Sequence, residues 1–251
     1  MAHHQQVAHE RLYLWVQRKC PDVDSEMPDT NTSVLLRRAL QVLRARPAFY
    51  KHCQDIVTNT RRAMLVRRFM HALTRGGPNG TPRPIEVHAH DPQRYVGDML
   101  AWMHQAVATE RELVTAYFGE VPGAPAAGGR DGESKGVVAE GDETTDAVPR
   151  SSTEVIRDVL TNVFEGVATP LKMRVLQALG SGLSLLACFK LGDLISFYAE
   201  TVGVLLRSET GLAKAVTQCR EAAREQFSKQ LASQGAKLVN SPPVRCACCP
   251  Q

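Results

Sequence analysis

The residues best suited to chemistry lie in one short stretch of the chain. His88, His90 and Asp91 stand close together, and His104 follows them as the last histidine. Imidazole nitrogens and carboxylate oxygens are ligands for zinc or iron, so a metal-dependent enzyme is one hypothesis. No strand is indicated that would hold these side chains at the end of a barrel. Asp91 also precedes Pro92, which is typical of a helix N-terminus, so we expect no metal and no catalytic residues here.

Two further motifs give weaker signals. The glycine-rich stretch 76–80 lacks the Lys-Ser or Lys-Thr pair of a phosphate-binding loop, and a helix stop followed by a turn explains it better. Cys246, Cys248 and Cys249 offer three thiols near the end of the chain, without the partner pair of a structural zinc site. We therefore expect no cofactor.

Basic residues are concentrated between Leu35 and Arg75, where Asp55 is the single acidic residue. The formal net charge of +4 is modest, and we expect no nucleic-acid partner. Two interpretations of the basic stretch stay open. It is either the solvated face of two helices or a surface for an acidic protein or anionic lipid headgroups. The candidate interaction surface consists of Arg61, Arg62, Arg67, Arg68, Arg75, Arg83 and Arg94.

The elements that position these residues are expected to be helices. Aromatic residues make up only 6% of the chain, and abundant Ala, Leu, Arg and Glu favour helices packed on helices. In the first half, the pattern predicts helices over 5–19, 33–46, 48–75 and 91–118. Ser33 is a suitable N-cap for the second of these helices, Gly76 and Gly77 would end the third, and an extended connection would span 78–90.

The second half of the chain shows the same periodicity. Ser151 and Glu154 fit a capping box that begins a helix, and apolar residues recur at helical spacing in 171–179, 193–206 and 210–238. The alternation at 85–87 is too short to propose a sheet. The sequence therefore predicts an all-α fold, an elongated bundle of antiparallel helices.

A polar, Gly- and Pro-rich stretch interrupts this pattern. Residues 119–150 cannot bury enough apolar surface to offset their ordering entropy, which predicts a disordered linker or insertion. It would separate a helical segment 1–118 from a second helical segment 151–240, with an irregular Cys-containing tail at 241–251.

The compartment is indicated by further patterns. The first ten residues are polar, unlike a secretory signal. The most apolar run, 183–189, is far shorter than the roughly 18 residues that cross a membrane. Cys20, Cys53, Cys188 and Cys219 are scattered singly, as reduced thiols are. We expect the chain in the cytosol or on the cytosolic face of a membrane.

One continuous block carries a family resemblance. Residues 61–104 read RRAMLVRRFMHALTRGGPNGTPRPIEVHAHDPQRYVGDMLAWMH, flanked by HERLYLW at 9–15, RPAFYK at 46–51 and FEGVATPLK at 164–172. This block resembles the signature stretch of the family of sixth subunits of the conserved oligomeric Golgi complex. The resemblance covers most of 8–243 apart from the linker.

The resemblance implies a helical rod of the multisubunit tethering-complex type and a non-catalytic subunit acting in intra-Golgi retrograde transport. It also implies peripheral association with the cytosolic face of the Golgi membrane. The implied partners are the other subunits of the complex and, through it, SNARE proteins. The alternatives are the metal-dependent enzyme above and a basic helical module that binds anionic lipid.

The resemblance also raises an expectation about length. Members of this family are more than twice as long, which implies that the chain corresponds to their central part. Its last residues, 244–251, do not resemble the family's continuation beyond Pro243, so we expect a truncated or mis-spliced product.

Overall fold

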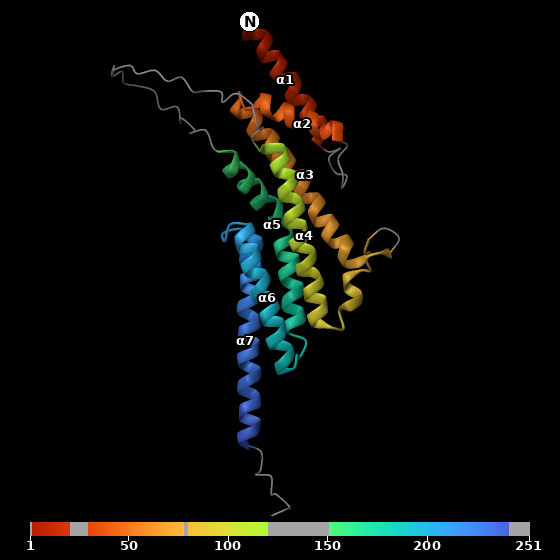
Figure 1. Cartoon of the computed structure of the whole chain (residues 1–251), viewed down its shortest axis with the longest axis vertical. Coiled ribbons are helices and arrows are strands. Elements are labelled where there is room, and N and C mark those ends of the chain that lie inside the picture. The colour runs from red at the N-terminus through yellow and green to blue at the C-terminus, as the bar shows by residue number, and fades with distance from the viewer. Residues whose placement is uncertain (1, 21–29, 78–79, 120–150, 241–251) are drawn as a thin grey trace, which may run out of the picture. The chain divides into compact units, whose positions relative to one another are not determined.

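The computed structural model describes residues 2–20, 30–77, 80–119 and 151–240 (Figure 1). These residues form α-helices, one short 3-10 helix and no strand, which confirms the predicted all-α class. The elements are α1 (Ala2–Lys19), α2 (Thr30–Leu43), α3 (Pro47–Thr74), η3 (Ile85–His88), α4 (Pro92–Phe118), α5 (Ser152–Leu179), α6 (Leu185–Leu205) and α7 (Gly211–Asn240). None of the described helices is long and apolar enough to cross a membrane.

The described residues divide into two compact units. Unit 1 comprises those within 1–57 and 110–160, and unit 2 comprises those within 58–109 and 161–251. Each unit therefore combines residues from both sides of the predicted linker, and α3, α4 and α5 contribute to both units. The predicted boundaries at 118, 151 and 240 stay a prediction, because 120–150 and 241–251 lie outside the described residues.

In unit 1, helices α1 and α2 pack against each other. Its buried side chains include Val16, Leu36, Leu40 and Leu43. Burying an aliphatic side chain of this size stabilises a fold by about 1.5–3 kcal/mol, so these contacts dominate the unit. At the edge, the ring of Tyr13 on α1 stacks 5.1 Å from that of Phe49 at the start of α3.

One arginine connects three segments of unit 1. The Nη2 of Arg44 donates to the backbone oxygen of Phe118 at 2.5 Å and to the Oγ of Ser152 at 3.3 Å. Its guanidinium also lies 5.9 Å from the ring centre of Tyr50. Residues on either side of 120–150 are thereby held together within this unit.

Unit 2 contains the ends of α3, α4 and α5 together with α6 and α7. The rings of Phe69 on α3 and Trp102 on α4 lie 5.2 Å apart. Helices α6 and α7 lie side by side along much of their length (Figure 1). The short connection 206–210 makes this pair antiparallel. Its shared core includes Cys188, Leu191, Ile195, Leu212, Val216 and Cys219.

Three predicted helix boundaries are confirmed by their hydrogen bonds and backbone geometry. The backbone N–H of Arg94 donates to the Oδ1 of Asp91 at 3.2 Å, which makes Asp91 the N-cap of α4. Ser151 and Glu154 bond reciprocally, through Glu154 N–H to Ser151 Oγ at 3.2 Å and Ser151 N–H to Glu154 Oε2 at 3.3 Å. Gly76 ends α3 with a φ of +79°, a conformation that glycine adopts without strain.

Other boundaries differ from the prediction. Helix α2 begins at Thr30, so Ser33 lies inside it and is not its N-cap. Helix α5 continues through Pro170 to Leu179, instead of starting anew at residue 171. Helix α6 begins at Leu185, where the Oγ of Ser184 accepts the backbone N–H of Ala187 at 3.3 Å, well before the predicted start at 193.

The connection before α4 is not extended throughout. Residues 85–88 form the 3-10 helix η3, and its Ile85 is buried. A single turn of helix that anchors one apolar side chain explains why the alternation at 85–87 does not produce a strand.

Candidate interaction surface

The arginines of the predicted surface all belong to unit 2, but they differ in exposure. Arg67, Arg75, Arg83 and Arg94 are exposed, Arg62 and Arg68 are half-buried, and Arg61 is buried with 2% of its surface exposed.

Arg61 and Arg62 contact the interior of unit 2. The Nη1 of Arg61 donates to the Sδ of Met64 at 3.5 Å, and this side chain does not reach the outer face. The Nε of Arg62 donates to the backbone oxygen of Asn162 at 2.6 Å, which links α3 to α5. A predicted surface that includes Arg61 is therefore incorrect at this position. The burial of Arg61 could have been predicted from helical spacing. Arg61 precedes the buried Leu65 by four residues, so both lie on the same face of α3.

Close packing brings Arg83 next to the end of α3. The backbone N–H of Gly77 donates to the backbone oxygen of Pro82 at 2.8 Å, which folds the connection back. A Cβ added at Gly76 would clash with that same oxygen and lie 3.0 Å from the carbonyl carbon of Arg83. A side chain at Gly76 would therefore force the backbone of residues 82–84, and Arg83 with it, away from the end of α3.

His71 belongs to the same face, although the predicted surface did not include it. It is exposed on α3 and lies four residues after Arg67 and four before Arg75. Residues four apart are neighbours on a helix surface. We call Arg67, Arg68, His71, Arg75 and Arg83 together the basic surface.

The stretch of sequence that carries the basic surface holds basic residues and no acidic ones. No acidic residue occurs in the sequence between Asp55 and Glu86. The Oε1 of Glu86 lies 3.7 Å from the Nη2 of Arg174, and the Oδ2 of Asp98 lies 3.8 Å from the Nε of Arg94. These pairs are exposed or partly exposed and contribute little to stability. Arg94 pairs with Asp98 of its own helix α4, and we confine the basic surface to residues of α3 and the connection that follows it.

The residues of the metal-site hypothesis serve local structure instead. Asp91 caps α4, and the Nδ1 of His90 lies 3.1 Å from the backbone oxygen of Val87. His104 is further along α4, about 20 Å from Asp91 at 1.5 Å per residue, and its ring lies 6.3 Å from that of Tyr198. Within the described part of the chain, no three His, Cys, Asp or Glu residues are placed to hold a metal ion.

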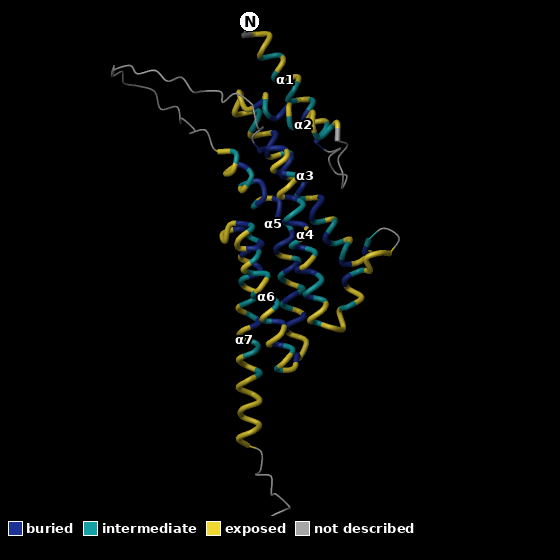
Figure 2. The backbone as a smooth tube through the Cα atoms, in the orientation of Figure 1, coloured by how far each residue is buried: buried dark blue, intermediate teal, exposed yellow. Residues whose placement is uncertain are grey.

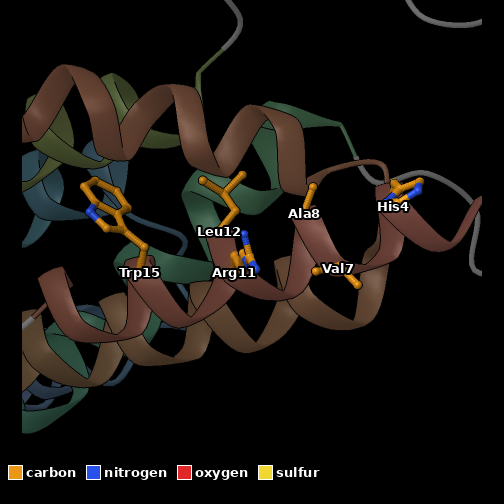
Figure 3. A pocket seen from close by; sticks show the side chains of 6 residues that line it. All are labelled: His4, Val7, Ala8, Arg11, Leu12 and Trp15. Carbon is orange, nitrogen blue, oxygen red and sulfur yellow. The ribbon is translucent and has the colours of Figure 1, made fainter. Parts of the chain in front are cut away.

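A shallow hollow in unit 1 lies along one face of α1 (Figure 3). The residues that line it recur at intervals of three and four: His4, Val7, Ala8, Arg11, Leu12 and Trp15. This hollow is open to solvent, and its lining contains no carboxylate or thiol. It offers a helix face for packing, and its one group suited to acid–base chemistry, His4, has no nucleophile or carboxylate beside it in the lining.

Comparison with known proteins shows which family the chain matches. The family model of the conserved oligomeric Golgi complex subunit 6, C-terminal, matches residues 1–247. The chain is 43% identical over 244 residues to conserved oligomeric Golgi complex subunit 6 of Arabidopsis thaliana, covering 97% of this chain. It is 37% identical over 241 residues to the protein of that name from Homo sapiens and 30% identical over 242 residues to that from Drosophila melanogaster, each covering 96% of this chain.

The matches cover only part of those relatives. The chain spans 34% of the Arabidopsis protein, 32% of the human protein and 34% of the Drosophila protein. No solved structure matches the chain.

Proposed function

The chain belongs to the family of conserved oligomeric Golgi complex subunit 6, matching its C-terminal region, and from this premise we propose that it acts as a non-catalytic part of a Golgi vesicle-tethering complex. The resemblance of residues 61–104 to this family is thereby confirmed. In this role the chain acts in intra-Golgi retrograde transport.

One observation carries the proposal. The family match extends over residues 1–247, so it includes both compact units and not merely a shared motif. The all-helical fold supports it, because packed helices offer large binding faces without special chemistry. The partners are other subunits of the complex, with SNARE proteins reached through the complex. The location is peripheral, on the cytosolic face of the Golgi membrane.

Within this role, the basic surface binds an acidic segment of a partner subunit. Its guanidinium groups suit bidentate contacts with carboxylates. An anionic membrane is the alternative ligand, and it would have to be held by the charges of this surface almost alone. Such binding is weak when no apolar anchor accompanies it. We therefore favour the acidic protein segment.

The test is a chimera in which this chain replaces the matching part of the human relative. In human cells that lack their own subunit 6, the chimera carries this chain in place of the matched 32% of the human protein. Affinity capture and mass spectrometry then measure recovery of the other named subunits. We expect recovery comparable to that with the intact human protein.

A matched control makes the experiment decisive. A chimera with a scrambled sequence in the replaced region measures recovery due to the rest of the human protein alone. Recovery no better than this control would contradict the proposal. Recovery well above it would support the proposal.

A further inference from the structure

The connection that follows α3 is held close to the end of that helix. The backbone N–H of Gly77 donates to the backbone oxygen of Pro82 at 2.8 Å. A Cβ added at Gly76 would lie 2.8 Å from the backbone nitrogen of Pro84, which is closer than such atoms come in proteins. Most residues of 80–90 are nevertheless exposed, and Figure 2 shows them largely in yellow. The connection therefore packs against α3 on one side and faces solvent on the other.

Arg83 stands between two prolines in this connection. Proline fixes its own φ near −65°, and the φ of Pro84 is −54°. A residue that precedes proline is restricted as well, so the backbone of Arg83 has little freedom. A side chain whose backbone is already ordered loses less entropy when it binds a ligand. Arg83 is therefore suited to bind a carboxylate of the acidic segment.

Glu86 is the carboxylate best placed to compete for Arg83. It follows Arg83 by three residues, so their Cα atoms lie at most about 11 Å apart. Both residues are exposed and have long side chains. If they paired, a carboxylate of the ligand would have to displace Glu86 before it could bind Arg83. The basic surface would then bind an acidic segment more weakly.

Arg174 of α5 pairs with this carboxylate instead. Its Nη2 lies 3.7 Å from the Oε1 of Glu86. Its Nη1 donates to the backbone oxygen of Pro170 at 3.4 Å, and its guanidinium also hydrogen-bonds with the side chain of Tyr95 on α4. The side chain of Arg174 is only 22% exposed. Ion pairs near the surface add little stability, so the main consequence of this pair is the direction in which Glu86 points.

We propose that Arg174 is a positioning residue of the basic surface, which pairs with Glu86 and so leaves Arg83 to bind a carboxylate of the acidic segment. This inference rests on the proposed function of the basic surface. Direct binding of the ligand by Arg174 fits less well, because this side chain is mostly buried and already contacts Glu86, Pro170 and Tyr95.

The experiment measures binding of a fluorescent deca-glutamate peptide to the whole chain by fluorescence anisotropy at low salt. Arg174→Gln should weaken binding by about threefold, because Glu86 then pairs with Arg83. Glu86→Gln alone should not weaken binding. Combined with Arg174→Gln, it should restore the affinity of the unchanged chain, because no carboxylate is then left to compete. A merely structural role of Arg174 would not give this rescue.

Arg94→Gln is the matched control. Arg94 pairs with Asp98 at 3.8 Å, as Arg174 pairs with Glu86 at 3.7 Å, and both substitutions remove one positive charge from unit 2. The Arg94→Gln chain should bind the peptide as the unchanged chain does. In a chain that carries Arg83→Ala, Arg174→Gln should have no further effect on affinity. Circular dichroism of each variant verifies its folding.

The contrary outcomes separate this inference from the proposed function. Unchanged affinity of the Arg174→Gln chain, equal weakening by Arg94→Gln, or no rescue by Glu86→Gln would overturn the role of Arg174. If Arg67→Glu with Arg68→Glu still abolished binding, the proposed role of the basic surface would stand without that inference. Unchanged binding in that double variant, or no binding by the unchanged chain, would contradict the basic surface and the inference together.

Discussion

Arg61 and Arg68 stand two helical turns apart on α3, yet their surroundings give them different roles. Arg61 is 2% exposed and contacts the sulfur of Met64, so its long aliphatic stem packs as part of the core. Arg68 is half-buried and belongs to the outer face with exposed Arg67. We therefore expect Arg67 and Arg68 to contribute to binding and Arg61 to contribute to the stability of the fold.

Reversing two charges of the basic surface tests its role in binding. In the chimera with the human protein, Arg67→Glu with Arg68→Glu should lower recovery of the other subunits by about tenfold, because like charges then face the acidic segment of the partner. The helical signal in circular dichroism should stay unchanged. The measurement is quantitative mass spectrometry of the captured subunits.

The matched control changes the same amount of charge elsewhere in unit 2. Lys214 and Arg224 are exposed on α7, and their replacement by Glu should leave recovery unchanged. Equal losses of recovery from both double variants would mean that the change in net charge causes the loss, whatever its position. Unchanged recovery with Arg67→Glu and Arg68→Glu would make these residues solvated surface only.

Buried thiols make the stability of the chain sensitive to alkaline pH. Cys20, Cys53 and Cys219 are free and buried. Burial raises the pKa of Cys20 to about 12, with a further contribution from nearby Cys53, and raises the pKa of Cys53 and that of Cys219 to about 11, against an ordinary 9.0. The folded state therefore disfavours the thiolate more than the unfolded state does.

The direction of the pH effect is set by these pKa values. A pKa that folding raises gives stability that is complete below pH 9, the ordinary thiol value, and is lost as pH rises through 11 and 12. We expect the free energy of unfolding in urea to fall steadily above pH 9. Replacing Cys20 and Cys53 by Ala should make this fall shallower. An identical slope in that variant would show that other groups cause the loss.

At the scale of elements, close contact between α3 and α5 depends on one glycine. A Cβ added at Gly166 of α5 would lie 2.8 Å from the Cγ2 of Val66 and 3.1 Å from the Cγ of Arg62. Val66 is β-branched and has little freedom to move aside. Overpacking of this kind outweighs the helix propensity that Ala gains, so Gly166→Ala should lower the free energy of unfolding by about 1 kcal/mol.

Gly203 of α6 is the matched control, because nothing lies within 4 Å of a Cβ added there. Gly203→Ala should raise the free energy of unfolding by about 0.5 kcal/mol, from helix propensity alone. Thermal and urea unfolding measure both variants. A stabilising Gly166→Ala would mean that α3 and α5 separate at negligible cost.

Helix boundaries that depend on local hydrogen bonds were predictable from the sequence. The caps at Asp91 and Ser151 and the stop at Gly76 satisfy backbone groups within a few residues. Boundaries set by packing were not. Pro170 lies inside α5, where contacts of the whole helix override the cost of a missing N–H. Ser33 lies inside α2 for a similar reason, since apolar Leu36 and Leu40 hold that helix in the core.

The candidate site was predictable in part. A sequence shows the charge of Arg61, Arg67 and Arg68, but only packing decides which helix face is outermost. The exposed apolar side chains of α6 were missed because an apolar residue such as Phe197 looks like a core residue until its neighbours are known. Exposure of an apolar side chain is a property of the whole fold, and periodicity alone does not reveal it.

At the scale of the whole molecule, each compact unit depends on both sides of residues 120–150. In unit 1, Arg44 bonds to the backbone of Phe118 and to Ser152. In unit 2, Arg62 bonds to the backbone of Asn162, and Arg174 lies 3.7 Å from Glu86. Neither 1–119 nor 151–251 therefore contains a complete unit.

This arrangement predicts the behaviour of the two fragments. Expressed alone, 1–119 and 151–251 should each aggregate or lose helical signal, because each exposes apolar faces that the other covers. Expressed together, they should purify as a one-to-one complex with the helical content of the intact chain. Size-exclusion chromatography with light scattering and circular dichroism measure both properties. The same pair carrying Gly166→Ala should associate more weakly, since Gly166 and Val66 then lie on different fragments. Two fragments that each unfold cooperatively as monomers, without associating when mixed, would mean that the halves of the sequence are independent domains.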